Sequence, residues 1–139
     1  MLTQLIYASR SARPLGPGDI KDILGSSRRN NARLGITGAL CLHNGVFLQI
    51  LEGERGAVNT LYHRIVADSR HRDAAILDFA EVNRRQFTRW SMGLLAATEE
   101  NRDLFLAYAS GAEFDPYAMS AASLRALFVE VQANVRWLG

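Results

Sequence analysis

Residues 36–53, ITGALCLHNGVFLQILEG, contain two apolar runs on either side of an Asn44-Gly45 pair. Such a pair predicts a two-residue turn between antiparallel strands, because both residues tolerate the positive φ that this turn needs. Side chains alternate between the two faces of a strand, so Gln49 lies on a face that is otherwise apolar. A buried carboxamide without partners costs about 1–3 kcal/mol per unmet group. The hairpin therefore raises the question of what Gln49 binds.

The segments around this hairpin predict a mixed fold. Residues 2–9 are rich in β-branched and aromatic side chains and indicate a first strand, and Asp19 is expected to cap a helix over residues 20–34 that ends at Gly35. The apolar periodicity predicts a second helix over residues 54–70, strands over 74–87 and 89–98, and C-terminal helices over 101–109 and 120–138.

The resulting order, βαββαββ, predicts an α+β, ferredoxin-like sheet with two helices on one face, plus C-terminal helices. In this topology the first strand lies next to the strand that carries Gln49, antiparallel to it. Tyr7 of the first strand can then reach Gln49 if the two share a face. The third partner is left open by the residues alone, since a main-chain group, a water molecule or a ligand would each satisfy the amide.

Composition excludes several classes of function. The chain has 139 residues, of which 48% are hydrophobic and 22% charged, as is typical of one soluble domain. Neither a membrane span nor a secretory signal is expected, so we predict a cytoplasmic protein that does not bind membranes. The single cysteine, Cys41, excludes an internal disulfide and a thiolate metal site and is expected in the core.

Charge and catalytic patterns point away from nucleic acid and from enzymes. The formal net charge is only +2, and the one dense basic run holds Arg28, Arg29 and Arg33, which fit either a solvated helix end or an anion contact. The three histidines are scattered, so neither a catalytic triad nor a metal site is indicated. An acylphosphatase is not supported either, because the loop after the first strand lacks a glycine-rich anion cradle. We therefore expect no enzyme and no nucleic-acid partner.

Four motifs, in order, resemble one family. They are LIYAS with Tyr7, NNARLGITGAL with Asn31, FLQILEG with Gln49, and RWSMG with Trp90 and Met92. Together they resemble the BLUF family, blue-light sensors that use FAD. The resemblance covers residues 2 to 98 and implies the same ferredoxin-like fold, with the flavin ring held between the two helices against the sheet.

The resemblance also implies roles for individual residues. Tyr7 is expected to give an electron and a proton to the photoexcited flavin, Gln49 to bridge the phenol and the ring, and Asn31 to anchor the ring. Trp90 and Met92 are the candidates for the signalling element, or else one is core and the other surface. Further expected cofactor contacts are Ile36, Ile65, Arg70 and His71, although a lone histidine in a loop also fits plain surface.

The whole chain is thus interpreted as a photoreceptor with FAD, or another flavin such as FMN in its place. Residues 1–98 are expected to form the flavin-binding domain, and residues 99–139 a helical extension that packs on the sheet or on a partner. We expect a homodimer that signals to a downstream protein whose identity the sequence does not specify. The alternative is a cofactor-free, ferredoxin-like dimeric interaction module, which would be colourless.

Overall fold

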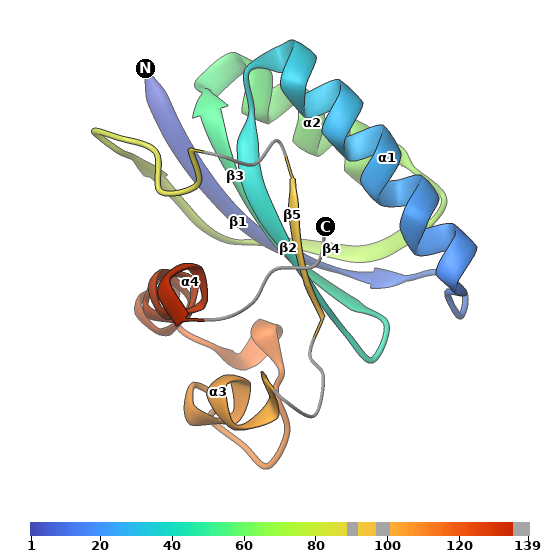
Figure 1. The fold of residues 1–139 in the computed structure, drawn as a ribbon, viewed down its shortest axis with the longest axis vertical. Helices are drawn as coiled ribbons and strands as arrows, with labels where there is room; N and C mark the ends of the chain where they lie inside the picture. The colour runs from blue at the N-terminus through green and yellow to red at the C-terminus, as the bar shows by residue number, and fades with distance from the viewer. Residues whose placement is uncertain (89–91, 97–100, 135–139) are drawn as a thin grey trace.

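The computed structural model describes residues 1–88, 92–96 and 101–134, which form a five-stranded sheet with helices on both faces (Figure 1). The strand order is β4-β1-β3-β2-β5. Along the chain the elements are β1 (Leu2–Ser11), α1 (Pro17–Leu34), β2 (Thr37–His43), β3 (Val46–Glu54), α2 (Arg55–Ala67), β4 (His71–Glu81), β5 (Gly93–Ala96), α3 (Arg102–Ala107), the 3-10 helix η2 (Pro116–Ala118) and α4 (Ala121–Asn134). The predicted α+β class and the order βαββαββ are confirmed.

The central strands pair as the topology predicts. β1 and β3 are antiparallel neighbours, and their register places Tyr7 directly opposite Gln49. Residues opposite each other in an antiparallel pair point to the same face, so the phenol and the amide lie side by side. β5 adds to the outer edge of β2 and runs parallel to it.

The hairpin forms where the sequence predicts it. β2 ends at His43, β3 begins at Val46, and the two turn residues have positive φ, 48° at Asn44 and 74° at Gly45. These angles match the type of turn whose twist fits antiparallel strands.

The start of α1 corrects one prediction. Gly16, not Asp19, is the N-cap, and the helix begins at Pro17. Asp19 is the third helical residue, and its carboxylate accepts a hydrogen bond from the Gly16 backbone N–H at 2.9 Å. Proline is favoured in the first turn because its missing N–H needs no partner there. The helix ends as predicted, with Gly35 in the left-handed region at φ 69°.

The boundaries of α2 and β4 also differ from the prediction. α2 ends at Ala67 because Asp68 takes an extended conformation and its carboxylate accepts from the Arg70 backbone N–H at 2.9 Å. β4 therefore starts at His71, three residues before the predicted position, and it stops at Glu81.

Two apolar clusters lie on opposite faces of the sheet. α1 and α2 cover the face that carries Leu5, Tyr7 and Leu51. The C-terminal helices lie against the other face (Figure 1), where Cys41 is buried in the core as predicted. Four residues of α4 are completely buried in that cluster: Leu124, Leu127, Phe128 and Val131.

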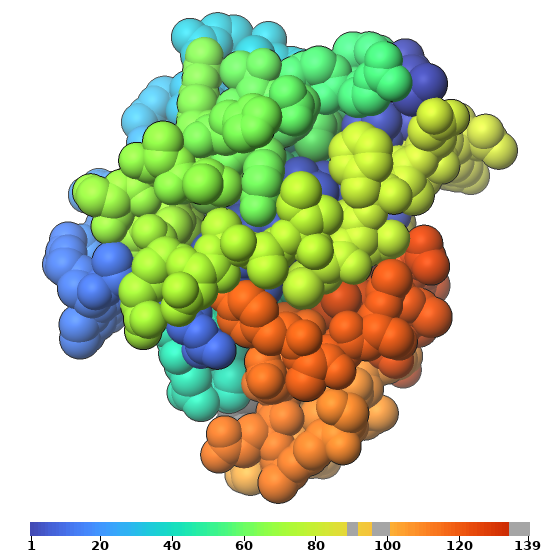
Figure 2. Space-filling model, turned by 180° about the vertical axis from the view of Figure 1, so that it is seen from behind, coloured from blue at the N-terminus to red at the C-terminus, as the bar shows by residue number. Residues whose placement is uncertain are grey.

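Figure 2 shows the molecule from behind, with β4 in yellow-green between α2 in green and the C-terminal helices in orange and red. β4 is an edge strand, and Ile76 and Phe79 on it are exposed. No helix within the described ranges has both the length and the apolar character needed to cross a membrane.

Candidate functional site

A pocket opens between α1, α2 and the face of the sheet that they cover. Its empty space, the open mouth and the solvent in it included, is about 610 Å³. The lining residues come from β1, both helices, the hairpin and the loop before β4: Tyr7, Ile23, Ser26, Ser27, Asn30, Asn31, Leu40, Phe47, Gln49, Leu61, Arg64, Ile65, Asp68, Arg70 and His71.

Three side chains at the sheet end of the pocket form a hydrogen-bonded row. The Tyr7 hydroxyl donates to Gln49 Oε1. Gln49 Nε2 in turn donates to the sulfur of Met92 at 3.2 Å. All three residues are buried, with 1%, 5% and 2% of their surface exposed. The Gln49 amide, whose partners the sequence did not identify, thus has a phenol on one side and a thioether on the other.

Burial determines the charge of the Tyr7 phenol. It raises the pKa of Tyr7 well above the usual value, and the nearby Tyr62 adds to the shift. The two rings meet edge to face with their centroids 5.3 Å apart. Tyr7 is therefore a neutral phenol at any physiological pH, and its hydroxyl donates its hydrogen bond to Gln49.

Asn31 and an apolar group form the walls of the pocket. Asn31 is 1% exposed and comes from the last turns of α1. Leu40, Phe47 and Ile65 lie in the lining. Ile36, expected to contact a cofactor, is buried in the same apolar cluster but is not part of the lining.

His71 lies where α2 leads into β4. Its Nδ1 is 2.8 Å from the buried Ser9 hydroxyl, and its ring lies 4.6 Å from that of Phe47. Burial lowers the pKa of His71, the Asp68 carboxylate raises it, and Arg70 lowers it further, for a net downward shift. A neutral, half-buried imidazole in the pocket wall is not plain loop surface.

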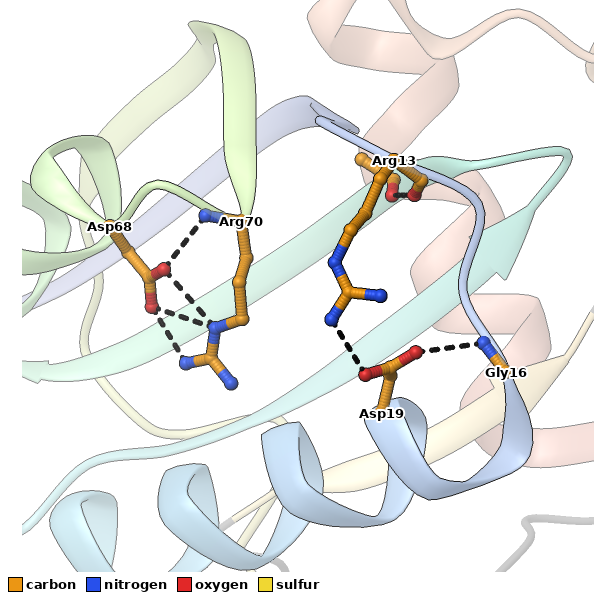
Figure 3. Close-up of polar contacts among 6 residues, drawn as sticks. Arg13, Gly16, Asp19, Asp68 and Arg70 are labelled. Carbon is orange, nitrogen blue, oxygen red and sulfur yellow. Dashed lines mark hydrogen bonds and ion pairs between the residues drawn. The ribbon is translucent and has the colours of Figure 1, made fainter.

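Two ion pairs lie near the pocket, one before β4 and one at the start of α1 (Figure 3). The Arg70 guanidinium contacts the Asp68 carboxylate at 2.6 Å, and this hydrogen bond lowers the pKa of Asp68. Arg13 pairs with Asp19 at 3.0 Å at the start of α1. Each of these two guanidinium groups is therefore paired with a carboxylate.

The structure also involves residues that the sequence did not single out. Arg28 of α1 donates from Nε to the Met92 carbonyl oxygen at 3.1 Å. Glu52 is completely buried, three residues after Gln49. A charged residue inside an apolar strand was the available signal for Glu52, whereas no pattern distinguishes Arg28 from the arginine beside it. Trp90 lies outside the described residues, so only Met92 of the predicted signalling pair can be placed.

No group of three or more His, Cys, Asp or Glu side chains in the described part of the chain is arranged to hold a metal ion. The pocket instead combines apolar walls with a few convergent polar groups. That is the usual character of a site for a small organic molecule.

Comparison with known families identifies the family of the chain. The family model described as "Sensors of blue-light using FAD", BLUF, matches residues 2–93. The chain belongs to the BLUF family. The resemblance of the four motifs is thereby confirmed, and the chain is a homologue of flavin-binding, blue-light-sensing proteins.

Relatives of this BLUF chain include larger proteins. It is 40% identical over 100 residues to photoactivated adenylate cyclase subunit beta of Euglena longa, covering 71% of this chain and 11% of that protein. The corresponding subunit of Euglena gracilis is 41% identical over 100 residues, and the match again covers 71% of this chain and 11% of that protein. The chain thus spans about a tenth of the length of the curated relatives it matches.

Solved structures extend the similarity beyond the BLUF match. The photo-activated state of BlsA superposes with a TM-score of 0.87 at 28% identity, covering 98% of each chain. The dark state of BlrB, a BLUF protein, superposes with a TM-score of 0.74 at 35% identity, covering 92% of this chain and 95% of that one. A bacterial light-regulated adenylyl cyclase matches 75% of this chain but only 32% of its own length, with a TM-score of 0.70 and 32% identity. The ferredoxin-like fold is therefore shared both with BLUF proteins of similar length and with a longer protein in which the match covers only part of the chain.

Proposed function

We propose that this chain detects blue light through FAD bound non-covalently in the pocket between α1 and α2. The observation that carries the proposal is the buried Tyr7–Gln49 hydrogen bond at the sheet end of that pocket. The bond brings a neutral phenol and a rotatable amide to the place where a flat ring would lie. Neither group is needed there for packing alone, because an apolar pair would fill the same space at lower desolvation cost.

The residues of the lining suit the chemistry of a flavin. Apolar side chains from the two helices and the sheet, Ile23, Leu40, Leu61 and Ile65, offer contacts to the faces and edges of a ring. Asn31 adds an amide that can both donate and accept hydrogen bonds. Arg64 and Arg70 line the pocket nearer to solvent and suit phosphate groups. FMN in place of FAD would use the same ring contacts.

A bound flavin would supply blue-light absorption, which no protein side chain provides, and a site that accepts an electron and a proton. Tyr7 serves as the donor of both. Its hydroxyl already donates to Gln49 Oε1, so the proton has a path when the phenol loses an electron. Because burial disfavours a charged ring, the electron and the proton leave Tyr7 together.

After the electron and the proton return to Tyr7, a rotated Gln49 amide would remain as the structural change. The amide has an oxygen at one end and two N–H donors at the other, so a rotation exchanges acceptor and donor. A rotated Gln49 would turn its oxygen toward the Met92 sulfur, which can only accept hydrogen bonds. Met92, and Trp90 two positions before it in the sequence, are the residues that we propose respond to this exchange.

The proposed output is a change in the interaction with another protein. Residues 99–139 are proposed as an extension separate from the sensor of residues 1–98, and the boundary between them lies outside the described residues. The described part of α4 packs on the face of the sheet opposite the pocket, which supports a path from Gln49 to the extension. Homodimer formation, the downstream protein and the cytoplasmic location stay predictions.

The decisive experiment is an absorption spectrum of the purified chain before and after blue illumination. We expect a yellow protein whose flavin band shifts in the light and returns in the dark, and chromatography of the released pigment identifies FAD or FMN. A colourless protein that takes up no flavin would refute the proposal and favour the cofactor-free interaction module.

Variants at the phenol test the assignment of residues. Tyr7→Phe should retain the yellow colour and lose the light-induced shift, because the ring remains while the donor is removed. Tyr62→Phe is the matched control, since it removes the neighbouring hydroxyl and leaves Tyr7 intact. A normal shift in Tyr7→Phe, or a lost shift in Tyr62→Phe alone, would contradict the role of Tyr7.

A further inference from the structure

Two described residues between β4 and β5 belong to apolar clusters on opposite faces of the sheet. Phe87 belongs to the apolar cluster under the C-terminal helices, and its ring meets that of Phe128 in α4 at 6.2 Å. Met92 belongs to the cluster under α1 and α2. The segment of residues 86–92 therefore has one end in the cluster opposite the pocket and the other end in the cluster on the pocket side, while residues 89–91 lie outside the described ranges.

A buried carboxylate holds the first end of this segment. Glu52 accepts hydrogen bonds from the backbone N–H groups of Gln86 and Phe87, each at 2.8 Å, and from Gln4 Nε2 at 3.0 Å. Within the described ranges no lysine or arginine forms an ion pair with it. A charge buried without a counter-ion is costly unless several donors satisfy it. Two of those donors belong to the segment, so the segment and the carboxylate hold each other in place.

A guanidinium group holds the second end. Arg28 donates from Nε to the backbone oxygen of Met92 at 3.1 Å. Arg28 lies on α1, three positions before Asn31 and so about one helical turn from it. The helix that contributes Asn31 to the pocket thus also holds the residue that contacts Gln49.

The position of Met92 determines which way the Gln49 amide faces. A thioether sulfur accepts hydrogen bonds and donates none. While Met92 stays in place, Gln49 is favoured with Nε2 toward the sulfur and Oε1 toward Tyr7, as observed. A rotated amide would set its oxygen against the sulfur. Holding Met92 therefore disfavours the rotated amide.

We infer that Arg28 and Glu52 are positioning residues for the photochemical site: they anchor the two ends of the segment ending at Met92 and so favour the unrotated Gln49 amide. The inference rests on the proposed function, because the rotated amide is the proposed product of light. Both residues act through Met92 and touch neither Tyr7 nor Gln49 among the contacts observed.

The test is the rate at which the flavin spectrum of the full chain returns in the dark after a blue flash. In Arg28→Met, Met92 can withdraw and the rotated amide is no longer disfavoured. We expect the return to slow about tenfold, which corresponds to about 1.4 kcal/mol. Glu52→Gln keeps the size of the side chain and should also slow the return.

Two comparisons separate positioning from a general loss of stability. Arg29→Met is the matched control on the same helix, because Arg29 contacts Ser26 of its own helix, and its return rate should stay within about twofold of the unmodified chain. In a Met92→Ala background, adding Arg28→Met should leave the rate unchanged, since the residue that transmits the effect is gone.

A return rate that is unchanged or faster in Arg28→Met overturns the inference, and so does a slowing that persists in the Met92→Ala background. If Glu52→Gln fails to fold, the Arg28 variants decide alone. The proposed function fails separately, through the absence of any light-induced shift in the unmodified chain. A normal shift there with no effect of Arg28→Met refutes only the positioning role.

Discussion

The Tyr7–Gln49 hydrogen bond can be tested by removing each partner and then both. Tyr7→Phe leaves Gln49 Oε1 without its donor, and Gln49→Leu leaves the phenol without its acceptor. The double variant removes both polar groups and keeps roughly the same volume. Because the two residues are 1% and 5% exposed, water cannot easily replace the missing partner.

The expected magnitudes follow from this burial. Each single change leaves a buried polar group unpaired and should lower the free energy of unfolding by about 1–3 kcal/mol. The double change should cost less than the sum, because replacing both partners by apolar groups can be nearly neutral. With a urea dependence of about 2 kcal/mol per M, each single variant should unfold at a midpoint lower by about 0.5–1.5 M.

Urea unfolding in the dark, followed by circular dichroism with flavin in constant excess, measures these differences. Flavin affinity is determined for each variant as well, so that the stabilisation caused by binding can be subtracted. Additive losses in the double variant would show that the two side chains do not interact. That result would remove the proton path that the proposed function requires.

Other predictions address separate parts of the molecule. Asn31→Ala should weaken flavin binding by about 1–3 kcal/mol if Asn31 anchors a buried ring, as flavin titration would show, whereas Asn59→Ala on the exposed side of α2 should not. Leu127→Ala should lower the unfolding free energy by about 2–5 kcal/mol, because Leu127 is completely buried, while the exposed Val129→Ala should change it by less than about 0.5 kcal/mol, both measured by urea titration. Because the pKa of His71 is lowered in the folded chain, the imidazole takes up a proton in the unfolded chain at a higher pH than in the folded one. The free energy of unfolding should therefore decrease as the pH falls below about 6.5. His71→Gln should flatten that part of a plot of unfolding midpoint against pH, and an unchanged slope would exclude His71 as its source.

The local patterns of the sequence determined much of the sheet. Asn44-Gly45 specified the hairpin because the turn depends on only two residues and their backbone angles. Strand alternation then placed Gln49 on the face toward the pocket and showed that its amide needed partners. The order of the elements predicted that β1 and β3 are neighbours, and so that Tyr7 can pair with Gln49.

Local patterns were insufficient where alternatives within a few residues were similar in energy. Gly16 and Asp19 both suit the start of a helix. The sequence did not show that Asp19 would lie inside the first turn and accept a hydrogen bond from the Gly16 backbone N–H. β4 begins at His71 because that residue pairs with Ser11, which lies sixty residues earlier in the chain. No pattern around His71 contains this information.

The tertiary structure alone decided how the charged residues around the site act. The sequence shows Glu52 as a charge in an apolar strand, but its backbone donors lie 34 and 35 residues further along the chain. It shows Arg28 and Arg29 as equals, whereas packing places Arg28 within hydrogen-bond distance of Met92. Contacts of this kind depend on which strands are neighbours and how the helices lie over them. Propensity and alternation describe each segment by itself, so these contacts arise only when the whole sheet has formed.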